Sequence, residues 1–175
     1  MPNSHKKLEE LDKLIEGIET AMFTTRRADG HLVSRPMATQ KRIADVDLWF
    51  VTDAETHKLD ELATDPHVCC SYYDSKSREW VSVSGVAHVS KNRKRIRDLY
   101  EPDWKVWFSD DGGNRNGGPD DPRIALIFVD ADSVIYMKND KPRPVVLWEA
   151  IKGMVTGNRP DVGEVRHIGA GELMD

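Results

Sequence analysis

Three segments between residues 33 and 58 carry the clearest signal of the fold: Val33-Ser34-Arg35-Pro36-Met37-Ala38, Leu48-Trp49-Phe50-Val51-Thr52 and Thr56-His57-Lys58. The first two segments predict β-strands separated by a turn, and the third predicts the start of a helix. This order brings an arginine, several hydroxyl groups and a lysine toward one region. Because arginine offers a planar fork and lysine a point charge, the set suits a phosphate attached to a flat apolar group. The pattern therefore indicates a nucleotide-like cofactor.

Each of these residues also has a purely structural interpretation. Asp53 or Thr56 could cap the helix, and the ammonium group of Lys58 could simply lie in water. Arg35 could be an ordinary arginine at a strand end, and Met37 could fill the core. Taken alone, the residues leave both interpretations open.

Periodicity and turn residues predict the other elements of the chain. We expect helices over residues 8–18, 55–64, 91–100, 103–108 and 144–155, and strands over residues 21–25, 31–40, 45–52, 67–73, 79–89, 124–129 and 133–137. The segment 110–121 predicts a loop, and the tail 158–175 gives no clear pattern. Because no helix separates the first three strands, we expect a mainly β, α+β protein: a six- to seven-stranded antiparallel split β-barrel with flanking helices, in a single domain over residues 1–175.

Composition excludes several classes of function. The 175 residues carry a net charge of −5, so no overall field attracts nucleic acid or an anionic membrane surface. The longest apolar run, residues 124–129, is far too short to span a bilayer. The first residues lack the apolar segment of a secretory signal, and we expect a cytoplasmic protein in which Cys69 and Cys70 stay reduced. Adjacent strand residues point to opposite faces, so these two thiols should not pair.

Other patterns receive structural interpretations first. The run 91–97 holds five basic residues in seven and most simply forms a solvated helix face, with an anion-binding patch as the alternative. Trp104 and Trp107 could pack in a core or interface, or lie over a ligand. Trp49 and Phe50 point to opposite faces of their strand, so one of them should be core. The histidines show no metal-ligand spacing, and we expect no metal site.

Several segments occur together in one order: Ser34-Arg35-Pro36-Met37, Leu48-Trp49-Phe50-Val51-Thr52, His57-Lys58, Asp65-Pro66-His67-Val68, Tyr72-Tyr73-Asp74, Val81-Ser82-Val83-Ser84-Gly85-Val86-Ala87, Trp107-Phe108 and Asp121-Pro122-Arg123. With this order and spacing, the chain resembles the pyridoxamine 5'-phosphate oxidase-like, FMN-binding split-barrel superfamily, and within it the general stress protein 26 branch. The resemblance implies a split-barrel homodimer that binds FMN at the subunit interface. It spans roughly residues 8–157.

The resemblance also implies roles for individual residues. Arg35 would contact the phosphate or ribityl end of FMN, the backbone of Pro36, Met37 and Ala38 would lie along the isoalloxazine ring, Val51 and Thr52 would flank the cofactor, and His57 and Lys58 would hold the phosphate. Gln40 stands where some relatives have a lysine, Trp80 lies near a ring-contacting glutamine of the oxidases, and Trp107, Arg123 and Trp148 would contribute from the partner side.

The chain departs from the family pattern at several positions. His57 replaces the usual arginine or serine, and Tyr136-Met137 replaces an aromatic residue followed by tryptophan. The arginine and histidine pattern that binds substrate in the true oxidases has no clear match, which argues against oxidation of pyridoxamine phosphate.

No residue stands out as a catalytic acid or base, so the catalytic residues stay unassigned. This suits a flavin-dependent oxidoreductase, because the flavin itself carries hydride or electron transfer. Two alternatives stay open. One is a non-enzymatic stress protein that binds or senses flavin, and the other is a split barrel that binds another cofactor, such as a deazaflavin or haem.

Overall fold

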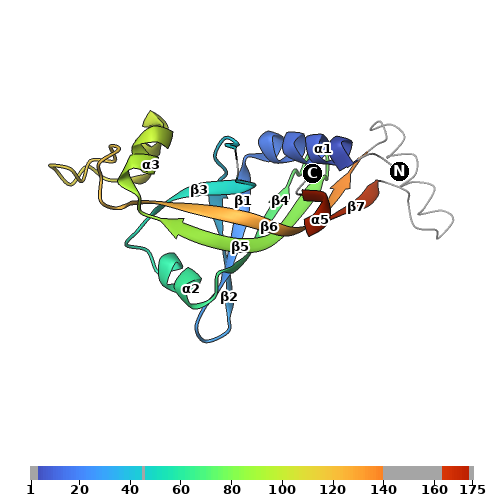
Figure 1. Cartoon of the computed structure of the whole chain (residues 1–175), viewed down its shortest axis with the longest axis horizontal. Helices are drawn as coiled ribbons and strands as arrows, with labels where there is room; N and C mark the ends of the chain where they lie inside the picture. Colours follow the sequence, from blue (N-terminus) through green and yellow to red (C-terminus); the bar gives the residue numbers. More distant parts are fainter. Residues whose placement is uncertain (1–3, 45, 140–162, 174–175) are drawn as a thin grey trace.

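The structure is a computed structural model that describes residues 4–44, 46–139 and 163–173. Figure 1 shows one twisted sheet with helices around it. The strands are β1 (Thr20–Arg26), β2 (Leu32–Ala38), β3 (Leu48–Asp53), β4 (His67–Tyr73), β5 (Trp80–Ser90), β6 (Ile124–Lys138) and β7 (Glu164–Gly169). The helices are α1 (Ser4–Ile18), α2 (Lys58–Thr64), α3 (Arg93–Leu99), the 3-10 helix η1 (Pro102–Trp107) and α5 (Ala170–Leu173).

The strands form an antiparallel sheet that curls into a barrel. Their order is β2-β1-β4-β5-β6-β3, and β7 pairs with the far part of β6. The end strands β2 and β3 meet only where β2 has ended, because Thr39 bridges to Phe50 and the amide of Gln40 donates to the carbonyl of Trp49 at 3.0 Å. The expected antiparallel barrel with flanking helices is therefore confirmed, and β2 keeps one free edge within the described chain.

Two apolar clusters hold this sheet in place. The first fills the barrel and includes Phe23 and Phe50, whose rings meet edge to face at 5.2 Å. The second lies outside the barrel, under α3 and η1, and contains Trp49 and Trp104. The expectation that one of Trp49 and Phe50 would be core was too narrow, since they are 4% and 0% exposed and belong to different clusters. Strand β3 is thus packed on both faces.

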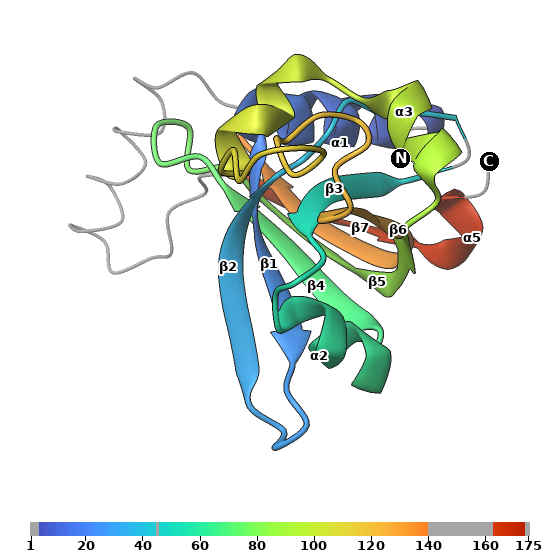
Figure 2. The same ribbon diagram turned by 90° about the vertical axis from the view of Figure 1, so that its left-hand side faces the viewer.

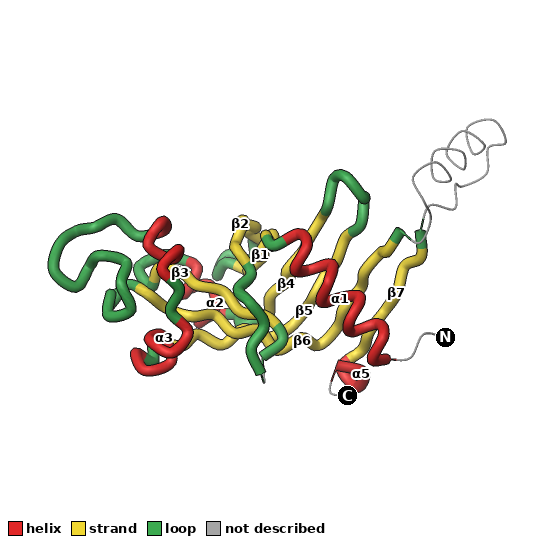
Figure 3. Tube along the Cα trace, turned by 90° about the horizontal axis from the view of Figure 1, so that it is seen from above, coloured by secondary structure: helices red, strands yellow, loops and turns green. Residues whose placement is uncertain are grey.

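Helix α1 covers the barrel. Figure 3 shows α1 lying across the strands, and its Leu11 and Ile15 are buried in the first cluster. These residues recur every four positions, as expected for one face of a helix. No helix in the described residues combines the length and the apolar character needed to cross a membrane.

The basic run 91–97 is largely engaged within the chain. The guanidinium of Arg93 donates to the carbonyls of Asp121 and Ile124. Lys94 pairs with Asp98, Arg97 pairs with Asp120, and Arg95 lies 4.0 Å from the ring centre of Phe128. These contacts favour the structural interpretation of the run over an anion-binding patch.

Strand β6 corrects the expectation of two separate strands over 124–129 and 133–137. It is one strand with a bulge, because Ser84 pairs with Ser133 whereas Gly85 pairs with Ala131. A side chain at position 85 would have no room, since an added Cβ would lie 2.1 Å from the carbonyl oxygen of Asp130. Because position 85 is a glycine, β6 can continue through the bulge without a clash. The bulge interrupts the alternation of apolar and polar residues, and in the sequence this interruption resembles the end of one strand and the start of another.

Other boundaries also differ from expectation. Helix α2 starts at Lys58 rather than at residue 55, because Asp53 holds the preceding turn: its Oδ1 accepts from the amide of Glu55 and its carbonyl accepts from the hydroxyl of Thr56, both at 2.8 Å. The N-cap is His57, so neither Asp53 nor Thr56 caps the helix. The expected strands over 31–40 and 45–52 reduce to β2 and β3, and the expected helices over 91–100 and 103–108 to α3 and η1.

The C-terminal part adds structure that showed no sequence pattern. Strand β7 and the short helix α5 lie within the tail 158–175, and β7 pairs antiparallel with β6. The expected helix over 144–155 lies outside the described residues. Cys69 and Cys70 are free, with Cys70 buried and Cys69 half-buried, as expected for adjacent residues of one strand.

We predict that Gly85→Ala lowers the free energy of unfolding by about 1–3 kcal/mol, because the added methyl group overlaps the backbone at Asp130. Urea denaturation followed by circular dichroism measures the change. Ser84→Ala, at the neighbouring exposed position, is the control and should change stability by less than about 0.5 kcal/mol. Equal stability of the two variants would contradict the role given to Gly85.

Candidate functional site

The candidate site lies where β2, the end of β3 and the start of α2 meet. Figure 2 shows the β1–β2 hairpin and α2 at the same end of the molecule. Alternation along β2 places Val33, Arg35 and Met37 on the face that turns toward the barrel. Thr52 is 5% exposed at the end of β3, and the ammonium group of Lys58 donates to its hydroxyl at 2.6 Å. Thr52 and Lys58 are therefore in contact, and the charge of Arg35 acts on Lys58, but of these three residues only Arg35 lines the cavity described below.

Arg35 belongs to a compact network of three side chains. Its Nη1 donates to Oγ1 of Thr25 at 2.7 Å, and its Nη2 donates to Oε2 of Glu61 at 2.8 Å. The hydroxyl of Thr25 also donates to Oε2 of Glu61, at 2.5 Å. The side chain of Glu61 is only 12% exposed and that of Arg35 is 23% exposed. The network links strands β1 and β2 to helix α2 at the candidate site.

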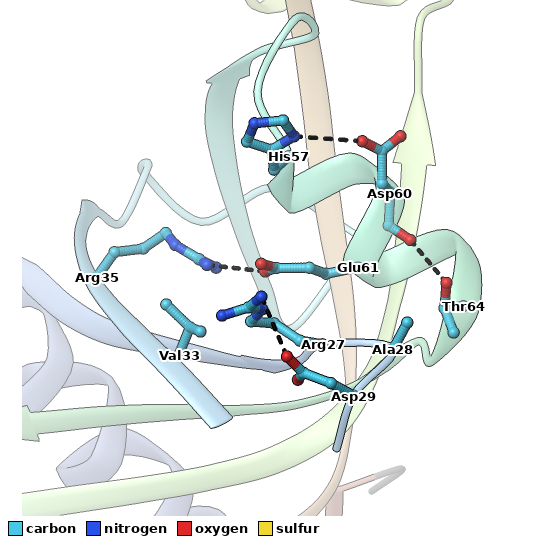
Figure 4. A pocket seen from close by; sticks show the side chains of 9 residues that line it. All are labelled: Arg27, Ala28, Asp29, Val33, Arg35, His57, Asp60, Glu61 and Thr64. Atoms are coloured by element: carbon cyan, nitrogen blue, oxygen red, sulfur yellow. Dashed lines mark hydrogen bonds and ion pairs between the residues drawn. The ribbon is translucent and has the colours of Figure 1, made fainter. Parts of the chain in front are cut away.

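An open cavity of about 750 Å³ lies between the β1–β2 hairpin and α2. It is lined by side chains of both signs, as Figure 4 shows: Arg27, Ala28, Asp29, Val33, Arg35, His57, Asp60, Glu61 and Thr64. The imidazole of His57 is 98% exposed, with Nδ1 at 3.7 Å from a carboxylate oxygen of Asp60. With so few constraints, His57 can turn toward a ligand in this cavity.

The electrostatics of the site come from burial and from charges close together. The pKa of Lys58 is lowered to about 8 by burial and by repulsion from Arg35, although Asp53 and Glu61 act in the opposite direction. Burial alone would raise the pKa of Glu61, but hydrogen bonds from Thr25 and Arg35 outweigh this effect and leave the pKa below its usual range. At neutral pH the site therefore holds an ionised carboxylate and a lysine that is still mostly protonated but has a pKa unusually close to neutrality.

The segment Pro36, Met37 and Ala38, whose backbone is predicted to lie along the flavin ring, has its side chains on both faces of β2. Met37 is 7% exposed and packs in the barrel core, in agreement with its structural interpretation. Pro36 and Ala38 are exposed on the opposite face of β2. Val51 is half-buried against the second apolar cluster. The backbone of residues 36–38 nevertheless runs along the free edge of the sheet.

Three other predicted site residues lie away from the cavity. The side-chain oxygen of Gln40 accepts from the indole of buried Trp104 at 3.0 Å. Trp80 is half-buried and stands opposite Met137 on β6. Trp107 lies on η1 and is 71% exposed. None of these side chains lines the cavity beside Arg35.

The predicted partner-side residues have different outcomes. Arg123 is 4% exposed, and its guanidinium pairs with Asp121 at 2.7 Å and donates to the carbonyl of Ser109 at the same distance. Arg123 is therefore engaged within its own chain and has almost no surface to offer a partner. Trp148 lies outside the described residues. In the described ranges, no group of three or more His, Cys, Asp or Glu side chains is arranged to hold a metal ion.

Sequence reasoning missed Thr25 and Glu61. Glu61 follows Lys58 by three residues, a spacing that places both on one face of a helix. Thr25 pairs with Val33 in the hairpin register, which makes it a diagonal neighbour of Arg35. Counting outward from the Asp29-Gly30 turn would have found Thr25, and the helical spacing would have singled out Glu61.

Comparisons with known proteins agree with this architecture. A family model described as "Pyridoxamine 5'-phosphate oxidase like" matches residues 6–161. Protein bli-3 of Neurospora crassa is 33% identical over 171 residues, which cover 96% of this chain and 82% of that protein.

Solved structures show the same fold. A protein of Jannaschia sp. CCS1 described as a general stress protein 26 superposes with a TM-score of 0.69 at 20% identity, covering 94% of this chain and 99% of that one. The general stress FMN/FAD binding protein from Xanthomonas citri superposes with a TM-score of 0.63 at 24% identity, covering 78% and 92%.

We predict that Arg35→Met lowers the free energy of unfolding by about 2 kcal/mol, because it leaves the carboxylate of Glu61 desolvated without its cation. The double variant Arg35→Met/Glu61→Leu should recover most of this loss, since it removes both charges together. Urea denaturation measures both variants. Arg27→Met is the matched control, because Arg27 pairs with Asp29 while 54% exposed. A loss for Arg35→Met no larger than that for Arg27→Met would contradict the network.

Proposed function

Because the chain belongs to the pyridoxamine 5'-phosphate oxidase-like family, we propose that it is an FMN-binding flavoprotein of the general stress protein type and a flavin-dependent oxidoreductase. One observation supports this most strongly: Lys58 donates to Thr52 at the end of β3, and Arg35, whose charge acts on Lys58, lines the open cavity between the hairpin and α2. The similar protein from Xanthomonas citri is described as binding FMN or FAD.

The residues present fit the phosphate of FMN. Lys58 is half-buried, and the hydrogen bond of its ammonium group goes to the neutral hydroxyl of Thr52. A phosphate would add negative charge beside this cation, whose pKa is lowered by burial and Arg35 more than Asp53 and Glu61 raise it. Arg35 would contribute from β2, and the exposed imidazole of His57 can donate from the start of α2. These residues would hold the cofactor, and FMN would supply hydride or electron transfer when bound.

The free edge of β2 fits the flavin ring. Along Leu32–Ala38, β2 pairs with β1 on one side only, so the other edge presents backbone N–H and C=O groups. The exposed pyrrolidine of Pro36 stands beside Met22, which is 43% exposed. Such an edge offers hydrogen bonds to the polar rim of a flat ring and apolar contact to its face. The strand would thereby orient the ring, while Lys58 fixes the phosphate.

We also propose that the protein is a homodimer with FMN at the subunit interface. Four side chains form an apolar row across the outer face of the sheet, because Tyr73, Trp80, Met137 and Val165 stand in register on β4, β5, β6 and β7. Tyr73 is 62% exposed and Val165 is 48% exposed. Trp80 belongs to this row and Trp107 is 71% exposed on η1, so both could contact a partner subunit and its cofactor.

Free Cys69 and Cys70 are compatible with a reducing compartment, and we propose that the protein is cytoplasmic.

Two other functions can be distinguished from the proposed one. An FMN-loaded protein that oxidises NAD(P)H would support the oxidoreductase, whereas a bound flavin that is never reduced would indicate a binding or sensing role. A protein that ignores FMN but binds a deazaflavin or haem would be a split barrel with another cofactor.

We predict that the affinity for FMN falls about tenfold between pH 7 and pH 9, because Lys58 has a pKa of about 8 and must be protonated to hold the phosphate. The phosphate is already mostly dianionic at pH 7, so the amine dominates the change. Fluorescence titration of the purified protein with FMN measures this dependence.

Lys58→Arg is the matched control for that titration, since its guanidinium stays charged over this pH range and should flatten the profile. A wild-type affinity that does not change with pH would contradict the role of Lys58. Absence of FMN binding at micromolar concentrations would overturn the proposed function.

For the dimer, we predict that Met137→Glu shifts the protein to monomers, because it places a charge in the middle of the apolar row. Light scattering coupled to size exclusion measures the mass. The control is Val106→Glu, at a residue that is 76% exposed on η1 and lies outside this row. A wild-type monomer, or a Met137→Glu dimer of unchanged stability, would argue against this interface.

A further inference from the structure

The phosphate site contains an unusual element, a buried carboxylate among its cations. Glu61 is 12% exposed, and its Oε2 accepts hydrogen bonds from both Thr25 and Arg35. Thr25 is itself 1% exposed, whereas the side chain of Arg35 is 23% exposed and lines the open cavity. Arg35 therefore has an anionic partner before any ligand arrives.

We propose that Glu61 competes with the phosphate of FMN for Arg35 and so keeps the affinity for the cofactor low enough for exchange. This inference rests on the proposed function. Both terminal nitrogens of Arg35 are used within the chain, Nη1 by Thr25 and Nη2 by Glu61. An incoming phosphate must either take Arg35 from the carboxylate or lie next to it. In both cases two anions share one guanidinium, which weakens the binding of each.

Burial makes this carboxylate different from its neighbour in the sequence. Asp60 also lines the cavity, but its side chain is 86% exposed and stands 3.7 Å from His57. Water and salt screen a charge in that position. The charge of Glu61 is screened less because its side chain is less exposed, and the hydrogen bonds it accepts lower its pKa, so that it stays charged at neutral pH.

The other charged groups around Arg35 and Glu61 leave this balance in place. Arg27 attracts Glu61 but is already paired with Asp29 at 3.1 Å, in solvent. Lys58 lies one helical turn before Glu61 and donates to Thr52 instead. The hydrogen bond of Lys58 goes to a neutral hydroxyl, whereas Arg35 already bonds a carboxylate, so a phosphate at Arg35 either displaces Glu61 or shares the guanidinium with it. The consequence is a cofactor that equilibrates with free FMN rather than one bound permanently.

Glu61→Gln tests this inference, because the amide keeps an oxygen that can accept from Arg35 and loses only the charge. Calorimetric titration of the full chain with FMN should show an affinity about tenfold higher than that of the wild type. Titration with riboflavin, which lacks the phosphate, should give no gain. Asp60→Asn is the matched control: it removes the same charge from the exposed neighbour and should change the FMN affinity less than about twofold.

The outcomes separate this inference from the proposed function. If the wild type binds FMN but Glu61→Gln binds it equally or more weakly, Glu61 orients Arg35 without competing, and the inference fails alone. An equal gain with riboflavin, or an equal gain in Asp60→Asn, would also overturn it. A wild type that does not bind FMN overturns both. Thermal melting checks folding, and Glu61→Ala, for which the same direction is expected, replaces a Gln variant that does not fold.

Discussion

The double-sided burial of β3 is the constraint on which the rest of the structure depends. Phe50 packs inside the barrel and Trp49 packs outside it, so sliding the strand by one residue would move each ring into a cluster that is packed around the other one. The same strand closes the barrel through the bridge from Phe50 to Thr39. With β3 fixed, Thr52 comes to its end at one defined place, and the turn that follows delivers Lys58 to it.

Interactions between charged side chains hold the site together at this strand end. These interactions are strong because water has limited access to the side chains. Arg35 and Glu61 are both largely buried and satisfy each other, together with Thr25. Lys58 lies nearby with a lowered pKa, because it is buried and feels the charge of Arg35. The two cations therefore differ: Arg35 is paired with a carboxylate inside the protein, whereas Lys58 would gain more from an external anion. The phosphate of the proposed cofactor would address this asymmetry.

Much of this could be predicted from sequence because it depends on local patterns. The two-residue alternation of the strands, the Asp29-Gly30 turn and the absence of a helix between the first three strands were sufficient for the barrel, whereas the roles of Arg35, Thr52 and Lys58 stay predictions. The continuous β6 could not be predicted, because its bulge depends on the partner strand at Gly85. Strand β7 and the contacts of Glu61 and Arg123 depend on tertiary pairing, which leaves little trace in local periodicity.

The free edge of β2 fits the proposed site, in which a second subunit would cover the cofactor. An exposed strand edge invites unwanted pairing, and proline within such a strand is tolerated only at the edge. Pro36 therefore both marks β2 as the edge and lowers the risk of further strand addition. The edge still exposes backbone groups and the apolar atoms of Pro36 and Met22 beside a charged cavity. A flat cofactor covered by a second subunit would satisfy the backbone groups and bury the apolar ones, which gives the outer face of this sheet a function that the barrel alone does not require.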